Sequence, residues 1–497
     1  MLRVSRLVWL LGVSVACHDG STVEPRDGAT EPTQPGNTTF ASLGKGGEQT
    51  LLGKLYATSK WSICQPSTVC GSADSDWGAD SLTYALYFRW SLTRDAAILP
   101  ILSALNAGGP TYGTCLRGTC TGWSDVPEWD SIAASREYEA TGDASALTRA
   151  EDAFGFVDTS NAFAIGACPA IDYQAPSGGT NQLKTLETDS NYIKAALLLH
   201  DETGNAEYLA KAEAKYASVR QYFVDPSVPL YTVYVVDTGT ACTQIPRRFF
   251  GSVNGNMILN GLLLHDATGT TGYRDDAIAT ATALDHDLSD PGGVYEDLQA
   301  ENDVTEPLVE AFYRLATAEG QAFARAWLLR NASASATDLD ASGSYGRFWG
   351  GPAPTAATTA WQTNGGLALA FAAADIAPTE SPTGNDIWRN VSMTSMDITT
   401  LPATVTFTGS AIALFGTIGE ECCESGHARL FIDGVESFDQ TGIWQNKSSS
   451  GRSLPGSVLF AWRWPSSGAH TIGFSPGVPN PKEGTSFLHV QGYMAVP

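Results

Sequence analysis

Apolar residues recur at the spacing of an α-helix from about Phe40 to Ile376, and a repeated turn separates successive helices. The clearest copies of the turn read REYEATGDASAL, LLHDETGNAEYL and LLHDATGTTGYR, and a weaker copy reads YRLATAEGQAFA. The copies recur about every 50 to 65 residues, as in stacked helical hairpins. The glycine in each copy supplies the left-handed conformation that ends a helix. The sequence therefore predicts an array of helical hairpins.

An earlier pair at Asp80–Asn106 and a last apolar run at Leu367–Ala374 bring the array to about six hairpins. Carboxylates and amides gather just before each predicted inner helix. They lie at Asp76 and Asp80, Ser124–Glu128, Glu187–Asn191, Ser252–Asn256, Glu301–Glu306 and Gln362–Asn364. A closed ring would collect these side chains in one cup, whereas an open solenoid would spread them along a ridge. The distribution favours the ring, an all-α (α/α)6 barrel, over the solenoid.

A segment rich in Pro, Thr and Ser at Pro378–Gly384 ends the helical pattern, and the apolar period then falls to two. Strands are predicted at Ala403–Thr408, Ala411–Phe415, Ala428–Ile432, Ser457–Trp464, His470–Phe474 and Ser486–Tyr493. These strands predict an all-β sandwich of jelly-roll type, and the segment of roughly 110 residues is in the size range of such a domain. Two interpretations stay open: a carbohydrate-binding module with Trp444, Trp462 and Trp464 as candidate platforms, or a packing module that shields the barrel.

The N-terminus carries Arg3 and Arg6, then an apolar run, then Cys17. This is the layout of a signal peptide, and the run is too short to span a membrane. The small residue before Cys17 resembles a bacterial lipoprotein signal, in which the cysteine is acylated. An ordinary cleaved signal is the alternative. Either predicts an exported protein, and the first predicts a lipid-anchored one at the bacterial cell surface or outer membrane.

The chain is thus predicted to have five parts. They are a signal peptide (1–17), a disordered linker (18–39), the barrel (40–377), a second linker (378–386) and the sandwich (387–497).

The charge excludes one class of partner and the cysteines indicate an oxidising compartment. With 29 basic and 53 acidic residues the formal charge is −24, which argues against nucleic acid as a partner.

Eight cysteines remain once Cys17 is set aside, an even number that indicates disulfides. The candidate pairs are Cys64–Cys70, Cys115–Cys120, Cys168–Cys242 and the adjacent Cys422 and Cys423. None has zinc-site spacing with histidines, so we expect no bound metal. We also expect no cofactor and a monomeric protein.

Four stretches in the helical part resemble glycoside hydrolase family 76, the bacterial and fungal endo-α-1,6-mannanases. They are the helix that ends in the TGD turn at Asp143, the segment Cys168–Tyr173, SVNGNMILNGLLLHDATG from Ser252, and a tail of LLRNASASA, SYGRFWGGP and Trp361-Gln362-Thr363. The resemblance covers most of Trp123–Ala374. It implies an (α/α)6 barrel that cleaves α-mannosidic linkages with retention of configuration, using two consecutive aspartates at the start of one inner helix.

The chain departs from this family pattern at two places. At the distance from the TGD turn where the family has Asp-Asp, this sequence has Asp125-Val126. Where the family has a Lys-Asn pair before the next inner helix, it has Leu186-Glu187. The first aspartate is therefore kept and the second is lost.

Glycoside hydrolysis needs two carboxyl groups, about 5–5.5 Å apart for retention or about 6.5–9.5 Å apart for inversion. Asp125 is the first catalytic candidate, as nucleophile or base. Glu128 lies one turn further along nearly the same helix face, and Glu187 belongs to the neighbouring inner helix at the same rim. The alternative is structural, because Asp125-x-x-Glu128 is also a helix N-terminus signal and Glu187 suits a solvated first turn.

Candidates for substrate binding are polar and aromatic residues near the starts of the inner helices. They are Trp129, Asp130, Asp189, Asn191, Asn254, Trp349 and Trp361. A flat indole ring complements the apolar face of a pyranose, although a tryptophan at such a position can equally belong to the core.

These features predict an exported glycoside hydrolase that acts on α-mannan or a related microbial polysaccharide or oligosaccharide. The alternative is a catalytically impaired glycan-binding surface protein that kept the cup and lost an acid at Val126. A second carboxylate within about 10 Å of Asp125 favours hydrolysis, and its absence favours binding.

Overall fold

The computed structural model describes residues 38–57, 60–61, 64–65, 76–106, 124–159, 163–174, 182–296, 305–337, 339–340, 343–353, 358–384, 386–419, 425–446, 453–477 and 488–497. The predicted signal peptide, Cys17 and almost all of the first linker lie outside these residues, as do the predicted pairs involving Cys70, Cys115, Cys120, Cys422 and Cys423. Across the described ranges, no helix has the length and apolarity that crossing a membrane requires.

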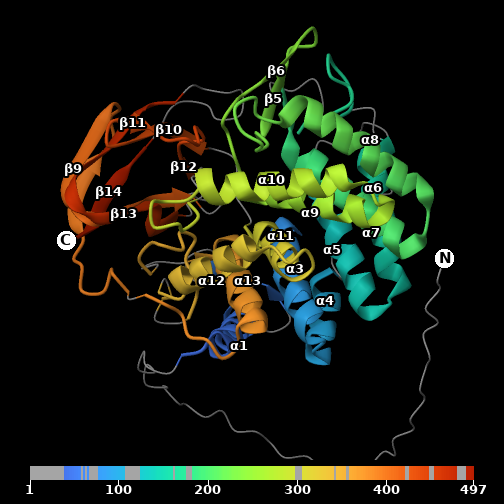
Figure 1. Ribbon diagram of the computed structural model, residues 1–497, viewed down its shortest axis with the longest axis horizontal. Helices are drawn as coiled ribbons and strands as arrows, with labels where there is room; N and C mark the ends of the chain where they lie inside the picture. Colours follow the sequence, from blue (N-terminus) through green and yellow to red (C-terminus); the bar gives the residue numbers. More distant parts are fainter. Residues whose placement is uncertain are drawn as a thin grey trace, which may run out of the picture. The chain divides into compact units, whose positions relative to one another are not determined.

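The helical part is a closed ring of hairpins (Figure 1). The inner helices are α3 (Asp76–Thr93), α5 (Asp125–Thr141), α7 (Leu186–Thr203), α9 (Gly251–Thr268), α11 (Glu306–Thr317) and α13 (Ala360–Ile376). Their outer partners are α4 (Leu99–Asn106), α6 (Ala144–Thr159), α8 (Ala206–Phe223), α10 (Thr271–Asp287), α12 (Ala322–Ser335) and α1 (Phe40–Thr50). Each inner helix contacts the next in this order, and α13 contacts α3. The predicted (α/α)6 ring is confirmed over the open solenoid.

The sixth hairpin joins the two ends of the helical part, because α1 packs on α13. Two glycines of α1 allow the close approach. A Cβ at Gly44 would lie 2.9 Å from the Cβ of Ala374, and one at Gly47 would lie 2.9 Å from Leu367.

The repeated Thr-Gly turns end α5, α7 and α9 in the same way, as predicted. Gly142, Gly204 and Gly269 have φ values of 73°, 71° and 73°. In the second copy, Thr203 Oγ1 donates to the carbonyl of Leu199 (2.6 Å) and accepts from the N–H of Asn205 (3.1 Å). This geometry satisfies carbonyls and amides that a helix end leaves open.

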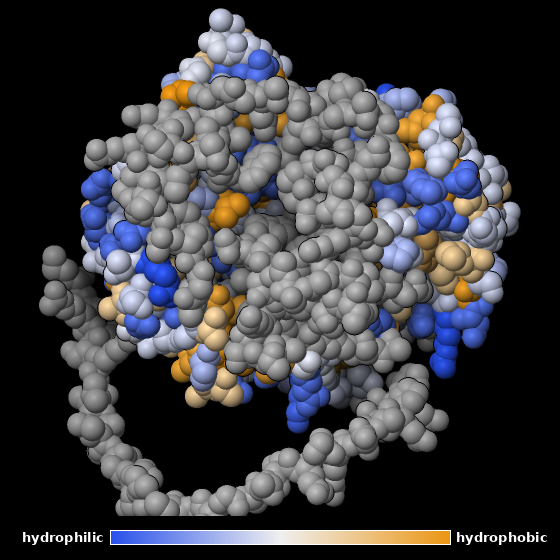
Figure 2. Space-filling view, turned by 180° about the vertical axis from the view of Figure 1, so that it is seen from behind, coloured by the Kyte–Doolittle hydropathy of each residue, from blue (hydrophilic) through white to orange (hydrophobic). Residues whose placement is uncertain are grey.

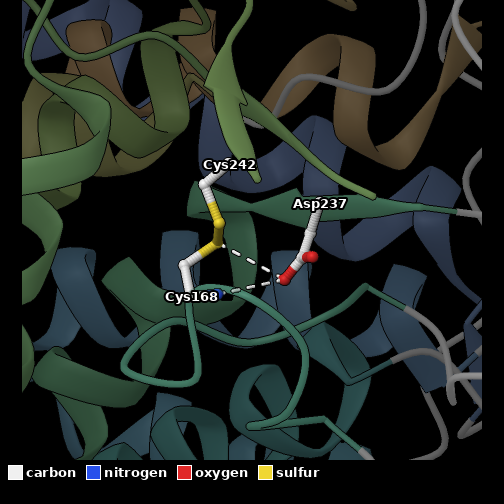
Figure 3. Close-up of side chains that lie close together, drawn as sticks. All are labelled: Cys168, Asp237 and Cys242. Atoms are coloured by element: carbon white, nitrogen blue, oxygen red, sulfur yellow. Dashed lines mark hydrogen bonds between the residues drawn. A yellow bond between two sulfur atoms is a disulfide. The ribbon is translucent and has the colours of Figure 1, made fainter. Parts of the chain in front are cut away.

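A small sheet stands at the opposite end of the ring, where the chain enters the inner helices. It has the order β4–β5–β6, with β4 at Leu183–Thr185, β5 at Tyr234–Asp237 and β6 at Cys242–Gln244. The predicted disulfide between Cys168 and Cys242 is present, with a Cα–Cα distance of 6.1 Å. It ties the loop before α7 to the hairpin before α9 (Figure 3).

The C-terminal part is a seven-stranded antiparallel sheet, and the sandwich stays a prediction. The strands are β8 (Thr394–Ile398), β9 (Ala403–Gly419), β10 (Ser425–Ile432), β11 (Val435–Glu436), β12 (Ile443–Asn446), β13 (Ser453–Pro476) and β14 (Val490–Val496). The order is β11-β10-β13-β9-β14-β8, and β12 pairs with β10. Two predicted pairs of strands are in fact single long strands, β9 and β13. Register shifts in β13, including one between Arg463 and Gly468, absorb residues that resemble a turn in the sequence.

The sheet contacts three segments of the helical part. The ring of Phe438 stacks on Phe249 with 6.0 Å between ring centroids, and Arg463 Nε donates to Asp290 Oδ2 at 2.7 Å. Trp388 Nε1 donates to the carbonyl of Gly350 at 2.9 Å. The contacted segments lead into α9, α11 and α13 respectively. The sheet therefore meets the ring at the end where the inner helices begin.

The coloured part of the surface in Figure 2 is largely hydrophilic, with small apolar patches scattered across it. Among the described residues, the large apolar side chains that are well exposed are Ile387, Met393 and Val435, all in the C-terminal part. The helical part has two extensive buried clusters, and the sheet has its own around residues such as Leu414 and Phe460.

Candidate active site

The N-terminal turns of all six inner helices, from the first to the third, contact one another around the ring. Ser124 Oγ lies 2.6 Å from Thr188 Oγ1, which joins α5 to α7, and Asn256 Nδ2 donates to Asn191 Oδ1 at 2.7 Å, which joins α9 to α7. The remaining contacts are Gly255 with the backbone of Leu308, Gly365 with Thr305, Asn364 with the carbonyl of Ser81, and the Tyr84 hydroxyl with the carbonyl of Trp129. These turns form one level of the ring, and we call the end of the ring at this level the cup end.

Asp125 is the first residue of α5 and lies half-buried at the cup end. The residue before it, Ser124, is the N-cap and makes no side-chain cap hydrogen bond. Instead the Ser124 hydroxyl donates to the carbonyl of Tyr173 (2.8 Å). The capping box suggested by Asp125-x-x-Glu128 needs Asp125 at the N-cap, so this structural alternative does not hold.

Glu128 is fully buried and points toward the outer layer of helices. Its charged neighbours include Asp158 on α6 and Lys215 on α8, together with Asp172 and Asp189. Neither carboxyl oxygen has a hydrogen-bond partner among the described residues. Burial raises the pKa of Glu128 well above its usual value, and Asp172 adds to the rise. Glu128 therefore sits behind α5, where burial disfavours its charged form.

Asp189 shares this location. Its Oδ1 lies 3.0 Å from Lys215 Nζ, and its Oδ2 accepts from the N–H of Asp172. Burial raises the pKa of Asp189 to about 7, although Lys215 acts in the opposite direction. The structure brings Glu128 and Asp189 close together. Because their neighbour Lys215 belongs to an outer helix, both carboxyl groups lie between the two helical layers.

Glu187 lies in the first turn of α7, next to the start of α5. Its Oε2 accepts from Gln174 Nε2 (3.3 Å) and from Thr185 Oγ1 (3.1 Å). Thr185 Oγ1 also accepts from the Glu187 N–H, so the N-cap and the carboxylate hold each other. The contact between Ser124 and Thr188 places Glu187 on the helix adjacent to Asp125.

The other predicted binding residues divide between the ring interior and the core. Asn254 is buried and bonds three backbone groups, at Tyr231 and Phe250. Trp349 is 1% exposed and packs edge-on against Trp327, so it belongs to the core. Trp129 is buried against the Tyr84 ring. Asp130 is half-buried on α5, and the Trp361 side chain lies outside the described part.

A charged network that the sequence analysis did not anticipate crosses the ring interior. Arg136 on α5 donates two hydrogen bonds, of 2.7 and 2.9 Å, to Glu310 on α11. Lys194 on α7 lies 3.4 Å from Glu310 Oε2 and 3.5 Å from Asn256 Oδ1. Because α5 and α11 stand opposite each other in the ring, this pair must cross the interior. Through Asn256 the network reaches Asn191, which places that predicted residue in the interior.

Glu306, the first residue of α11, stands one turn nearer the cup end than Glu310. It is 1% exposed, and its Oε2 has no hydrogen-bond partner among the described residues. Burial raises the pKa of Glu306 to about 8, and the charge of Glu310 adds to the rise, whereas Lys194 and Arg136 oppose it. The opposite holds for Glu310, where those two cations outweigh burial and lower the pKa to about 2.

Glu306 belonged to a polar run noticed in the sequence but was not chosen as a site residue. Its i, i+4 spacing to Glu310 puts both carboxylates on one helix face, next to apolar positions of α11. A charged pair on a face expected to be buried is the signal that could have selected it.

One group of three potential metal ligands occurs in the described ranges: Cys168, Asp237 and Cys242 (Figure 3). The two sulfurs are joined in the disulfide, so they are not available to a metal. The Asp237 carboxylate accepts the N–H groups of Ala167 and Cys168 and lies 3.8 Å from the buried Lys184 Nζ. Burial would raise the pKa of Asp237, but these backbone N–H bonds lower it overall. The cluster is a structural support for the β4–β6 sheet.

Solved structures of family 76 glycoside hydrolases share this fold. An α-1,6-mannanase, GH76A from Salegentibacter sp. HEL1_6, matches 67% of this chain and 99% of its own, with 20% identity and a TM-score of 0.58. A family 76 mannosidase from Bacteroides thetaiotaomicron matches 68% and 98%, with 13% identity and a TM-score of 0.57. Dfg5 from Chaetomium thermophilum, in complex with glucosamine, matches 70% and 92%, with 15% identity and a TM-score of 0.53.

An inactive variant of the Salegentibacter enzyme, in complex with α-1,6-mannotriose, has two consecutive aspartates replaced by asparagine. No family profile matches this chain, and no curated protein matches it. The similarity of structure confirms the fold that the sequence resemblance predicted.

Proposed function

We propose that the protein is an exported glycoside hydrolase that cleaves α-mannan, or a related microbial polysaccharide, at the cup end of the helical ring. One observation carries this proposal: Asp125 begins an inner helix at the cup end of a ring with the fold of family 76 mannanases. The inactive double-aspartate variant of one such mannanase indicates which residue type that reaction requires. Export is proposed from the N-terminal sequence alone.

Asp125 is assigned the role of nucleophile. In a retaining reaction its carboxylate attacks the anomeric carbon while an acid protonates the departing glycosidic oxygen. Water then attacks the glycosyl–aspartate ester, and the same acid, now a base, takes the proton from that water. Val126 stands where the resembling family has its second aspartate, so the acid must come from elsewhere in the site.

Glu306 is assigned the role of acid. A proton donor must hold its proton at the working pH, and the pKa of about 8 keeps Glu306 protonated near neutrality. The charge of Glu310, fixed by Arg136, separates the pKa values of the two glutamates, as in sites where one carboxyl is acid and the other stays ionised. Burial also raises the pKa of Glu128, but its neighbours on α6 and α8 place it away from the ring interior.

Glu187 is assigned to substrate binding at the rim. Its Oε2 already accepts two hydrogen bonds, which suits a carboxylate that orients a sugar hydroxyl. Asn191 is assigned to the same purpose from the ring interior, through its contact with Asn256.

The loss of the second aspartate at Val126 favours one alternative, a glycan-binding surface protein without turnover. The test is an incubation of the purified protein and its Asp125→Asn variant with linear α-1,6-mannan and a panel of other microbial polysaccharides. Released oligosaccharides would be separated by chromatography. We expect products from the wild type and at least a thousandfold fewer from the variant. Products from neither form, with retained affinity for one glycan, would replace the hydrolase with the binding protein.

A further inference from the structure

The C-terminal sheet is attached only to cup-end segments among the contacts described above. Arg247 and Phe249 precede α9, Asp290 lies between α10 and α11, and Gly350 precedes α13. Each segment lies between an outer helix and the inner helix that follows it. The sheet therefore stands beside the proposed site, on the α9–α11–α13 side of its rim.

A cavity of about 180 Å³ lies at this junction. On the ring side it is lined by the end of α10 and by Glu296, which is 5% exposed and precedes α11. On the sheet side it is lined by Trp462 of β13 and by Phe438, and Val435, 70% exposed, also lines it. Its volume is below the roughly 300–1,000 Å³ of pockets for drug-sized ligands, which fits a single small ring.

The lining has the two components of sugar recognition. Trp462 and Phe438 supply apolar ring surface, and Glu296 and Asp287 supply carboxylates that can accept hydrogen bonds from hydroxyl groups. The Trp462 ring is held in place by Phe460, which stacks on it with 6.1 Å between centroids and an angle of 18°.

The indole N–H of Trp462 is an unused donor. It is buried and has no hydrogen-bond partner among the described residues, although a buried tryptophan N–H usually has one. Trp464, two residues along the same strand, differs: its Nε1 donates to Asp433 (3.0 Å) and its ring stacks on His470. Trp464 is thus a structural residue, whereas Trp462 lines the cavity and its N–H has no hydrogen-bond partner in the described part of the chain.

We propose that this cavity binds one pyranose unit of the same polysaccharide chain whose cleavage is proposed at the cup. The inference rests on the proposed function for its ligand, and it assigns the C-terminal sheet the role of one wall of the substrate cleft. The sugar stacks on Trp462, and its hydroxyl groups bond the Trp462 N–H and the carboxylate of Glu296. The site acts on long substrates, since only a chain that leaves the cup can reach it.

The test measures binding in the full-length Asp125→Asn protein by titration calorimetry, with linear α-1,6-mannan and with α-1,6-mannotriose. The variants are Trp462→Leu and, as the matched control on the same strand, Trp464→Leu, with thermal melting to verify that each folds. We expect Trp462→Leu to weaken binding of mannan about tenfold and to leave mannotriose unchanged. Glu296→Gln should weaken mannan binding about threefold, and Trp464→Leu should leave it unchanged.

The outcomes separate this inference from the proposed function. If the wild type cleaves mannan but Trp462→Leu and Trp464→Leu bind it equally, the sugar site is wrong and the hydrolase stands. If the wild type cleaves nothing but is retained in affinity gels by one polysaccharide in a Trp462-dependent way, the sugar site stands and the hydrolase is wrong. If no polysaccharide of the panel retains it, both are wrong.

Discussion

The two ends of the helical ring are built by different means. At one end α5, α7 and α9 leave through the same short turn, in which a threonine hydroxyl and a left-handed glycine close the helix. At the cup end the connections are longer and carry the β4–β6 sheet, a disulfide and the attachment of the C-terminal sheet. Glu306, whose Oε2 has no hydrogen-bond partner within the described ranges, begins α11 at this end. The repeated turns depend only on local chain geometry. The connections at the cup end can therefore differ from one another in length and content.

Two buried glutamates, one at each end of the ring, allow the difference in function between the two ends to be measured. Glu306 at the cup end and Glu202 near the turn end of α7 each have a pKa raised to about 8, in both cases mainly by burial. The same titration is thus expected to matter for turnover at one end and not at the other.

The largest effect is expected from Glu306→Gln. It should lower turnover of mannan about a hundredfold or more, because an amide cannot protonate the leaving oxygen. For an aryl mannoside with a good leaving group, kcat/KM should be nearly unaffected, because the first step then needs little protonation, whereas kcat should fall because the second step still needs the base. In the wild type the protonated form of Glu306 is active, so kcat/KM should fall as the pH rises through 8, and this alkaline fall should vanish in the variant. The measurement is a pH–rate profile on both substrates.

Glu202→Gln is the matched control, since it removes a glutamate of equal pKa from the turn end. Its profile should retain the fall above pH 8. An unchanged profile in Glu306→Gln would remove that residue from the mechanism.

The next effect is on stability at the cup end. Cys168 and Cys242 are 74 residues apart, and a loop of that length predicts a loss of about 4.4 kcal/mol when both become serine. Urea unfolding of the double variant and the wild type measures it. A loss below about 1 kcal/mol would mean that the β4–β6 sheet holds this rim without its covalent link.

A smaller loss is expected where the C-terminal sheet meets the ring. Arg463→Met should cost about 2 kcal/mol, because it leaves the buried Asp290 carboxylate without its cation. The control is Arg429→Met, which removes a half-buried pair with Glu436 that is more exposed than the Asp290 carboxylate, and it should cost under about 1 kcal/mol. Equal losses in the two variants, measured by urea unfolding, would contradict the proposed importance of the junction.

The smallest effect belongs to the turn end. Gly204→Ala should cost about 1 kcal/mol, because alanine disfavours a φ of 71°, while no neighbouring atom obstructs the added methyl group. Gly155→Ala, in open space within α6, should instead stabilise by about 0.5–1 kcal/mol. Neither should change kcat/KM on mannan, and a change in Gly204→Ala would show that the two ends are coupled.

The ring was predictable because its evidence is local and repeated. Each Thr-Gly copy marks a helix end by itself, and the polar runs before the inner helices gave the cup end directly. The Cys168–Cys242 pair also followed from the sequence. The strand breaks predicted in the C-terminal part were wrong at Gly409 and after Trp464, because β9 and β13 continue through these positions with register shifts that depend on the partner strand.

The site was less predictable because burial depends on helices distant in sequence. Glu128 and Asp125 are one turn apart on α5, yet the burial of Glu128 against Lys215 arises from α8. Glu306 owes its raised pKa to the packing of α11 inside the ring and to Glu310. A sequence pattern indicates the helix face on which a carboxyl group lies. It does not indicate whether that carboxyl group has cationic neighbours in the folded chain.

The pairing of α1 with α13 also has a consequence for synthesis. Phe40–Thr50 leaves the ribosome early, but its partner Ala360–Ile376 follows only after roughly 300 residues, or about 15–60 s at 5–20 residues per second. Until then the first helix has no surface to cover its Phe40 and Leu43, which are buried in the finished ring. The nascent chain can stack its middle hairpins in order, but it closes as a ring only when its oldest helix meets its newest.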